Sequence, residues 1–312
     1  LPETVLQQAA AAVLNFNNTG LSILEISHRS KEFEAVMEHA RALVKELLNV
    51  PEGYEVLFLH GGASTQFAMV PWNLLKTKAA YVETGVWASK AIKEAKMLGE
   101  VNIVASSADK NFSYIPKGYE IPTDVDYLHI TSNNTIYGSE MHAFPECPVP
   151  LVCDMSSDIF SRPVDVSKFG LIYAGAQKNM GPAGATLVIV KKELLGKTGR
   201  KISSMLDYQV HIDGESMYNT PPAYAVFVCM LTLEWLKNLG GVNAIDKLNQ
   251  EKADYFYNAL DRMPAFKGTI AKEDRSRMNA CFLINDSSKE EAFLQKAKEA
   301  GEVPVGAIVV RD

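Results

Sequence analysis

The chain has 312 residues, of which 47% are hydrophobic and 22% charged, with a formal net charge of −6. This is the composition of a globular protein with a substantial core, long enough for one large domain and part of another. The acidic balance argues against non-specific nucleic-acid binding, which needs a basic surface, but it allows a local basic pocket for small anionic substrates.

Short apolar runs alternate with helical patterns along most of the chain. The runs are EVLFLH (55–60), AAYVETG (79–85), VNIVAS (101–106), DYLHITS (126–132), PLVCD (150–154), KFGLIYAG (168–175) and ATLVIV (185–190). Their alternation with helical segments predicts an α/β fold, with a mainly parallel central sheet and helices on both faces. Such sheets bind ligands outside the carboxyl ends of their strands, so polar residues after each run are candidate site residues.

A change of pattern near residue 245 predicts a domain boundary. A long helix is expected to begin with Thr220 as its N-cap and Pro221 in its first turn, and to end at Gly240-Gly241. After Asn243, charged amphipathic helices flank a strand-like MNACFLIN. We therefore expect a large domain over residues 1–245 and a partial, small α+β C-terminal domain over residues 246–312.

Lys178 follows the run KFGLIYAG, Asp154 ends the run PLVCD, and the two residues form the core of the predicted site. A lysine amine in a partly desolvated site can form a Schiff base with an aldehyde cofactor. The cofactor pyridoxal phosphate acts as an electron sink while its ring nitrogen stays protonated, and a neighbouring carboxylate such as Asp154 can hold that proton. Taken alone, Lys178 reads as a surface lysine and Asp154 as a cap of the Ser156-Ser157 turn, so only the combination carries weight.

Other strand ends supply the remaining parts of a cofactor site. The turn GGAST (61–65) opens a helix, so Ala63 and Ser64 can offer backbone N–H groups to a phosphate. Trp87 can stack on a pyridine ring, and Thr135 can hydrogen-bond the ring substituents or the phosphate. Each of these also has an ordinary structural reading as a turn or packing residue.

Before a predicted helix, EISHRS (25–30) places His28 and Arg29, which can bind a carboxylate or phosphate. Taken alone, Arg29 reads as a surface arginine near the start of that helix. The four cysteines match no zinc spacing, and we expect no metal. No signal peptide or membrane-spanning run is seen, which predicts a cytoplasmic protein.

In this order, the motifs resemble the phosphoserine aminotransferase family of class V, fold type I pyridoxal-phosphate enzymes. The resemblance is carried by ISHRSKEF, GGASTQFAMVPWN, TGVWASKAIKEAK, NNTIYG, LVCDMSSD, YAGAQKNMGPAG, YNTPP and RSRMN. YAGAQKN-GPAG and NTPP are the most specific of these within class V.

The resemblance implies a role for each candidate residue. It makes Lys178 the cofactor lysine, Asp154 the partner of the ring nitrogen and Trp87 the stacking aromatic. The other implied residues are the cofactor contacts Ala63, Ser64, Thr135 and Gln177, the phosphate contacts Asn219 and Thr220 to the other subunit of a homodimer, and the substrate ligands His28 and Arg29. The implied reaction transfers an amino group from L-glutamate to 3-phosphohydroxypyruvate, in serine and, in many bacteria, vitamin B6 biosynthesis.

Two departures from the family pattern leave alternatives open. The usual opening segment ending in Asn-Ala-Gly-Pro is absent, and residues 301–312 read GEVPVGAIVVRD in place of a Gly-His-Arg segment that helps to bind substrate. This tail resembles the opening strand of cytidine and tRNA-adenosine deaminases, but none of their zinc ligands follows. The alternatives are another class V enzyme, such as an alanine–glyoxylate aminotransferase or a cysteine desulfurase, and a truncated dimer that binds cofactor but is inactive.

Overall fold

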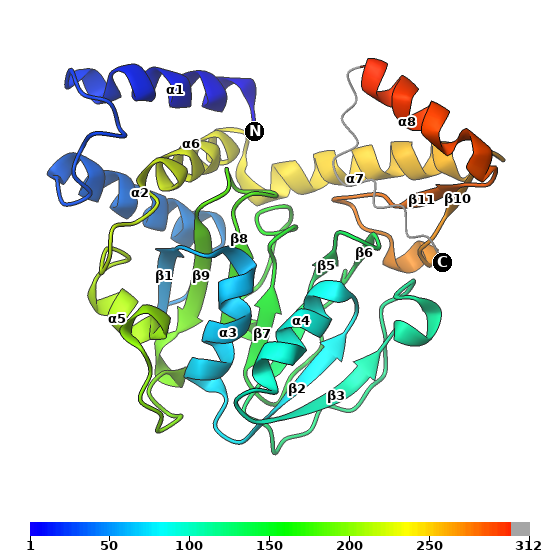
Figure 1. Ribbon diagram of the computed structural model, residues 1–312, viewed down its shortest axis with the longest axis horizontal. Coiled ribbons are helices and arrows are strands. Elements are labelled where there is room, and N and C mark those ends of the chain that lie inside the picture. Colours follow the sequence, from blue (N-terminus) through cyan, green and yellow to red (C-terminus); the bar gives the residue numbers. More distant parts are fainter. Residues whose placement is uncertain (301–312) are drawn as a thin grey trace.

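The computed structural model describes residues 1–300 and shows a seven-stranded central sheet between layers of helices (Figure 1). The strand order is β1-β9-β8-β7-β4-β2-β3. The strands are β1 (Tyr54–Leu59), β2 (Lys78–Glu83), β3 (Glu100–Ser106), β4 (Leu128–Thr131), β7 (Leu151–Asp154), β8 (Leu171–Gly175) and β9 (Thr186–Lys191). All seven apolar runs form strands, and the predicted α/β fold with a mainly parallel sheet is confirmed.

Strand β9 is the exception to the parallel arrangement, because it pairs antiparallel with both β1 and β8. The other pairs, β2 with β3 and β4, β4 with β7, and β7 with β8, are parallel. The carboxyl ends of every strand but β9 therefore lie at one edge of the sheet. The loops after these ends carry most of the predicted cofactor residues.

Helices cover both faces of the sheet, and each face has its own apolar core. On one side lie α1 (Glu3–Leu14), α2 (Lys31–Leu47) and α6 (Ala223–Asn238), and on the other α3 (Gly62–Leu74), α4 (Val86–Ala95) and the short α5 (Tyr208–Asp213). The alternation along β1 shows the division, because Val56 and Phe58 belong to the first core and Leu57 and Leu59 to the second.

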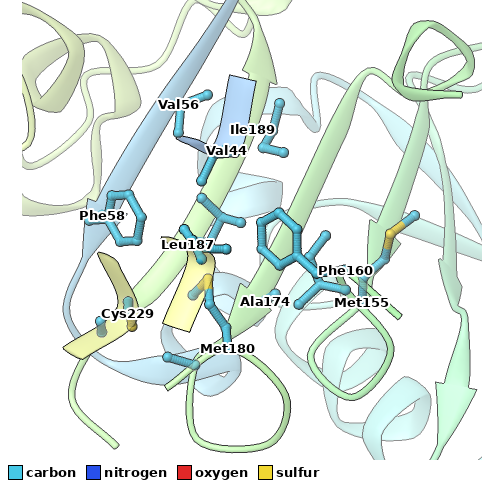
Figure 2. Close-up of a cluster of buried hydrophobic side chains, with 14 of the residues drawn as sticks. Val44, Val56, Phe58, Met155, Phe160, Ala174, Met180, Leu187, Ile189 and Cys229 are labelled. Atoms are coloured by element: carbon cyan, nitrogen blue, oxygen red, sulfur yellow. The ribbon is translucent and has the colours of Figure 1, made fainter. Parts of the chain in front are cut away.

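The core beneath α2 and α6 is the larger of the two. Figure 2 shows Val56 and Phe58 of β1 near Leu187 of β9, with Cys229 of α6 beside them. All four side chains are buried. Helix α6 is apolar around most of its circumference because it lies between the sheet, α1 and α2.

Helix α6 begins later than the sequence predicts. Its first residue is Ala223 and its N-cap is Pro222, so the expected N-cap at Thr220 is wrong. Since Pro221 precedes another proline, the α conformation is disfavoured there. The carbonyl of Thr220 is instead hydrogen-bonded by His60 Nε2, at 2.7 Å. The expected end of the helix is confirmed, because Gly240 follows the C-cap with a φ of 108°.

The C-terminal part forms a smaller group of elements at one end of the molecule (Figure 1). It comprises α7 (Gly241–Leu260), β10 (Phe266–Gly268), β11 (Phe282–Ile284) and α8 (Glu290–Glu299), and β10 and β11 pair antiparallel. MNACFLIN thus contains a strand between helices, as expected. Because α7 runs unbroken through residue 245, the division into two domains stays a prediction, and the segment 301–312 lies outside the described residues.

A hairpin of β5 (Asn133–Asn134) and β6 (Ser139–Glu140) follows β4 and reaches toward the C-terminal part. Among the described helices, none is by itself long and apolar enough to cross a membrane. Helices α6 and α7 satisfy the length and hydropathy test only as a pair, and an 83° bend separates them.

Candidate active site

Lys178 lies in the turn directly after β8, at the carboxyl edge of the sheet. Its side chain is exposed, yet the surrounding protein removes enough water from the amine to lower its pKa. The negative charges of Asp154 and Asp158 oppose this effect without cancelling it. A lysine with a lowered pKa has more neutral amine at a given pH, which is the form that attacks a carbonyl group.

Trp87 and Thr135 contact Lys178, although the three residues come from different segments of the chain. Trp87 lies in the first turn of α4 after β2, and its ring centre is 5.2 Å from Lys178 Nζ. The hydroxyl oxygen of Thr135, in the β5–β6 turn, accepts from Trp87 Nε1 at 3.3 Å and from Lys178 Nζ at 3.4 Å. Because the hydroxyl serves as acceptor in both bonds, its own proton remains available for a ligand.

Asp154 ends β7 and is almost fully buried, with 4% of its surface exposed. Ser156 donates to its Oδ1 through the backbone N at 2.9 Å and the hydroxyl at 2.6 Å. Asp154 therefore also caps the turn that follows it, so the structural and the functional reading of this residue are compatible. Burial raises the pKa of Asp154, while Ser156 and the charge of Lys178 pull it back.

The surroundings of Asp154 suit a positively charged ligand atom. A buried carboxylate whose charge is disfavoured by desolvation gains most from a nearby cation or charged N–H donor. On the same face of the sheet, burial lowers the pKa of His129 to about 3, so this imidazole stays neutral. Its Nε2 lies 2.9 Å from the hydroxyl of Tyr173. His129 therefore carries no positive charge near Asp154, whereas the charge of Lys178 lowers the pKa of Asp154.

The start of α3 offers an anion site. Gly61 and Gly62 have φ values of 92° and 64°, and the helix has no side-chain cap. The backbone N–H groups of its first turn, which includes Ala63 and Ser64, thus have no partner within the helix and carry its positive dipole end. Ser64 is exposed and can add its hydroxyl. These features fit a phosphate group.

The remaining predicted cofactor residues lie next to these groups. Gln177 precedes Lys178 and is exposed; its amide oxygen would come within 2.7 Å of a Cβ placed at Gly175. Asn219 and Thr220 precede α6, and the bond from His60 to the carbonyl of Thr220 holds this segment beside the Gly61–Gly62 turn. The amine, carboxylate, indole face and open helix start together fit pyridoxal phosphate.

His28 and Arg29 are not brought into this group. They lie in the turn before α2, where Arg29 Nε is 3.4 Å from His28 Nε2. In the part of the chain that the structure describes, neither side chain forms a hydrogen bond or ion pair with Lys178, Asp154 or Thr135.

The contacts of two residues near the site were not predicted from the sequence. Ser156, which fixes the Asp154 carboxylate, was recognised only as part of a turn. Asn279 belongs to RSRMN and donates to the backbone carbonyl of Thr135 at 3.0 Å. No local pattern signals this contact, because 144 positions separate the two residues.

The match to known proteins extends over almost the whole chain. The family described as aminotransferase class-V matches residues 1–306. A phosphoserine aminotransferase of Flavobacterium psychrophilum is 61% identical over 304 residues, covering 96% of this chain and 85% of the relative. One of Azobacteroides pseudotrichonymphae is 58% identical over 307 residues, covering 98% of this chain and 86% of the relative.

Solved structures give the same assignment. The phosphoserine aminotransferase of Bacillus circulans subsp. alkalophilus has a TM-score of 0.93 at 43% identity, covering 96% of this chain and 85% of that one. The pyridoxal-phosphate-bound enzyme of Trichomonas vaginalis has a TM-score of 0.90 at 35% identity, with 97% and 88% covered. An alanine–glyoxylate aminotransferase of Nostoc, at 14% identity, TM-score 0.76 and coverage of 96% and 81%, shares the fold alone.

The fold, the residues at the carboxyl ends of the strands and the similarity to known proteins therefore indicate the same family. The chain belongs to the class-V aminotransferases, which depend on pyridoxal phosphate, and within them to the phosphoserine aminotransferase family.

Proposed function

We propose that this protein transfers the amino group of L-glutamate to 3-phosphohydroxypyruvate, giving 2-oxoglutarate and O-phospho-L-serine for serine biosynthesis. The observation that carries the proposal is the convergence at Lys178. Its amine has a lowered pKa, faces the indole of Trp87 at 5.2 Å and donates to Thr135 at 3.4 Å. The names of the relatives at 56–61% identity support the phosphorylated substrate.

We assign the following tasks to the residues of the site. Bound pyridoxal phosphate supplies the electron sink that stabilises negative charge at the substrate Cα. Asp154 would keep the ring nitrogen protonated, and Trp87 would stack against the ring. The first turn of α3 would bind the phosphate through the N–H groups of Ala63 and Ser64. Lys178 Nζ would hold the cofactor aldehyde and would serve as the base that moves the α-proton of the substrate.

We further propose a homodimer in which the active sites are shared between subunits. Asn219 and Thr220 would contact the cofactor phosphate of the other subunit. His28 and Arg29 would bind the anionic groups of the substrate. Their separation from Lys178 within one chain is compatible with a site in the other subunit. Gln177 would contact the cofactor from the same turn as Lys178.

A cysteine desulfurase is disfavoured by the state of the thiols. Such an enzyme needs a nucleophilic thiolate near the cofactor. Cys153 and Cys229 are buried, and Cys147 and Cys281 are half-buried. Cys281 lies against the β5–β6 turn, where its thiol is 3.4 Å from the carbonyl of Ile136, but burial raises its pKa. A protonated thiol in this position is a poor nucleophile.

The test is optical. The purified protein with pyridoxal phosphate should absorb in the visible range and should lose that absorbance when L-glutamate converts the cofactor to its amine form. Adding 3-phosphohydroxypyruvate should restore it. Lys178→Ala should abolish the lysine-bound absorbance, and Lys90→Ala, which removes another amine 4.6 Å from the Trp87 ring, should not. A parent protein that binds no cofactor overturns the proposal, and absorbance without conversion would favour the inactive dimer.

A further inference from the structure

The segment RSRMN (275–279) packs against the β5–β6 hairpin, at the junction between the sheet and the C-terminal elements. Ser276 N donates to the carbonyl of Gly138 at 2.8 Å, and Arg277 N donates to Glu140 Oε2 at 2.7 Å. Ser139 also forms an isolated antiparallel bridge with Arg275. The hairpin is thus held on its outer side by the C-terminal part of the chain.

At the centre of this contact, the side chain of Asn279 uses both ends of its amide. Its Nδ2 donates to the backbone carbonyl of Thr135 at 3.0 Å. Its Oδ1 accepts from Asn133 Nδ2 at 2.9 Å and from Ser276 Oγ at 3.2 Å. Asn133 is 3% exposed and is also bonded to Ser157 Oγ at 2.9 Å, so the amide is anchored on buried groups.

Thr135 therefore has two kinds of contact. Its carbonyl faces Asn279, and its hydroxyl oxygen accepts from Trp87 Nε1 and Lys178 Nζ. The turn that carries it contains no regular secondary structure, so the position of the hydroxyl depends on what holds the backbone there. Of the side chains bonded to that carbonyl in residues 1–300, Asn279 makes the shorter bond, since Cys281 Sγ is 3.8 Å away.

We propose that Asn279 is a positioning residue of the active site: its amide fixes the Thr135 backbone so that the Thr135 hydroxyl stays between Trp87 and Lys178. This rests on the proposed function, in which Trp87 and Lys178 hold the cofactor, and on Thr135 as the cofactor contact that the family resemblance implies. It gives the C-terminal segment a direct mechanical connection to the cofactor pocket. A shift of that segment would then be transmitted to Thr135 through the Asn279 hydrogen bond to its backbone carbonyl.

The proposal is tested with Asn279→Asp, which keeps the acceptor for Asn133 and replaces the donor to Thr135 by a repelling oxygen. We expect the affinity of the cofactor-free protein for pyridoxal phosphate to fall about 5- to 10-fold, the scale of one lost intramolecular hydrogen bond. The tryptophan fluorescence of the cofactor-free protein should also change, because the Trp87 N–H loses its fixed acceptor. Asn279→Ser, which keeps a small polar group without the repulsion, should lose less affinity.

Asn285→Asp is the matched control. Asn285 lies in the same C-terminal part and donates to a backbone carbonyl, that of Pro264, at 2.7 Å, but it is exposed and away from the hairpin. It should leave cofactor affinity and fluorescence unchanged. Urea denaturation of all variants separates a general loss of stability from a local effect.

A double-mutant cycle tests whether Asn279 affects cofactor binding through the Thr135 hydroxyl. Thr135→Val keeps the backbone carbonyl and removes the hydroxyl, so Asn279→Asp should weaken cofactor binding much less in this background than in the parent. Full additivity of the two changes overturns the positioning role, as does an unchanged affinity of Asn279→Asp beside a weakened Thr135→Val. If the parent binds no cofactor, or Thr135→Val binds as tightly as the parent, the proposed site itself fails and the inference fails with it.

Discussion

In the proposed active site, reactivity depends on the proton affinity of individual groups, and Lys178 is the first of them. Its pKa lies below the ordinary lysine value of 10.5 because the surrounding protein removes water from the charged amine. The neutral form is the nucleophile. The rate at which the cofactor-free protein attaches pyridoxal phosphate should therefore rise with pH and level off after a midpoint below 10.5.

Stopped-flow absorbance over a series of pH values measures this rate. Lys90→Ala should leave the profile unchanged, although Lys90 also lies over the Trp87 ring. A midpoint at or above 10.5 would show that the surroundings of Lys178 do not favour the neutral amine.

Replacement of Asp154 should change the stability of the protein and its affinity for pyridoxal phosphate in opposite directions. Because burial raises its pKa in the folded chain, the ionised carboxylate costs folding free energy above its unfolded pKa, and this cost disappears as the pH falls through the raised value. Asp154→Asn should therefore unfold at a higher urea concentration at pH 7, with an advantage that shrinks in acid. Its affinity for pyridoxal phosphate should fall at least ~10-fold, because the ring nitrogen loses its charged partner.

Asp165→Asn is the control for Asp154→Asn, because Asp165 bonds the N and hydroxyl of Ser167 in the same way but on the surface. Its pKa is lowered by these bonds, so its loss should slightly reduce stability at pH 7 and leave cofactor binding unchanged. Equal losses of cofactor affinity in both variants would contradict a specific role for Asp154.

At the scale of elements, the link between β1 and α3 determines the geometry of the proposed phosphate site. Gly61 has a φ of 92°, and a Cβ there would lie 1.9 Å from Thr65 Oγ1. That hydroxyl donates to the Gly61 carbonyl at 3.0 Å, so the side chain cannot move away without breaking a bond at the helix start. The turn therefore requires glycine for two independent reasons.

Gly61→Ala should lower the free energy of unfolding by about 2–4 kcal/mol, the sum of left-handed strain and the clash, and should weaken phosphate-dependent cofactor binding. Gly53→Ala is the control, since Gly53 has a φ of 86° but nothing within 4 Å of the added Cβ. It should cost only about 1–2 kcal/mol and leave binding unaltered. Urea denaturation and cofactor titration measure both, and equal costs for the two variants would exclude the clash.

For the whole molecule, the proposed shared site predicts that inactive variants complement each other. When Lys178→Ala is coexpressed with the double variant Asn219→Ala and Thr220→Ala, hybrid dimers contain one site with an intact set of residues. About a quarter of all sites should then be competent, if the chains mix at random. The glutamate-driven loss of cofactor absorbance measures this recovery, and a signal no larger than the sum of the separate variants would contradict a shared site.

The central sheet and the location of the candidate site residues at its edge could be predicted from the sequence. Apolar runs of strand length predict buried strands, and the polar residues after them must gather because parallel strands end at the same edge. Lys178, Asp154 and Trp87 were predicted in this way, and their combination, together with the family resemblance, indicated a pyridoxal-phosphate site. The reversal of β9 and the start of α6 at Ala223 were not encoded in any local pattern.

How these groups face one another is visible only in the folded chain. That Thr135 bridges Trp87 and Lys178, and that Asn279 holds Thr135 from the opposite side, follows from hydrogen bonds between positions 43 to 144 residues apart. Such bonds leave no periodic trace, because they depend on the order of strands and the packing of the C-terminal segment. Strand-end chemistry is local and can be read from the chain, whereas the support behind it is a property of the folded molecule.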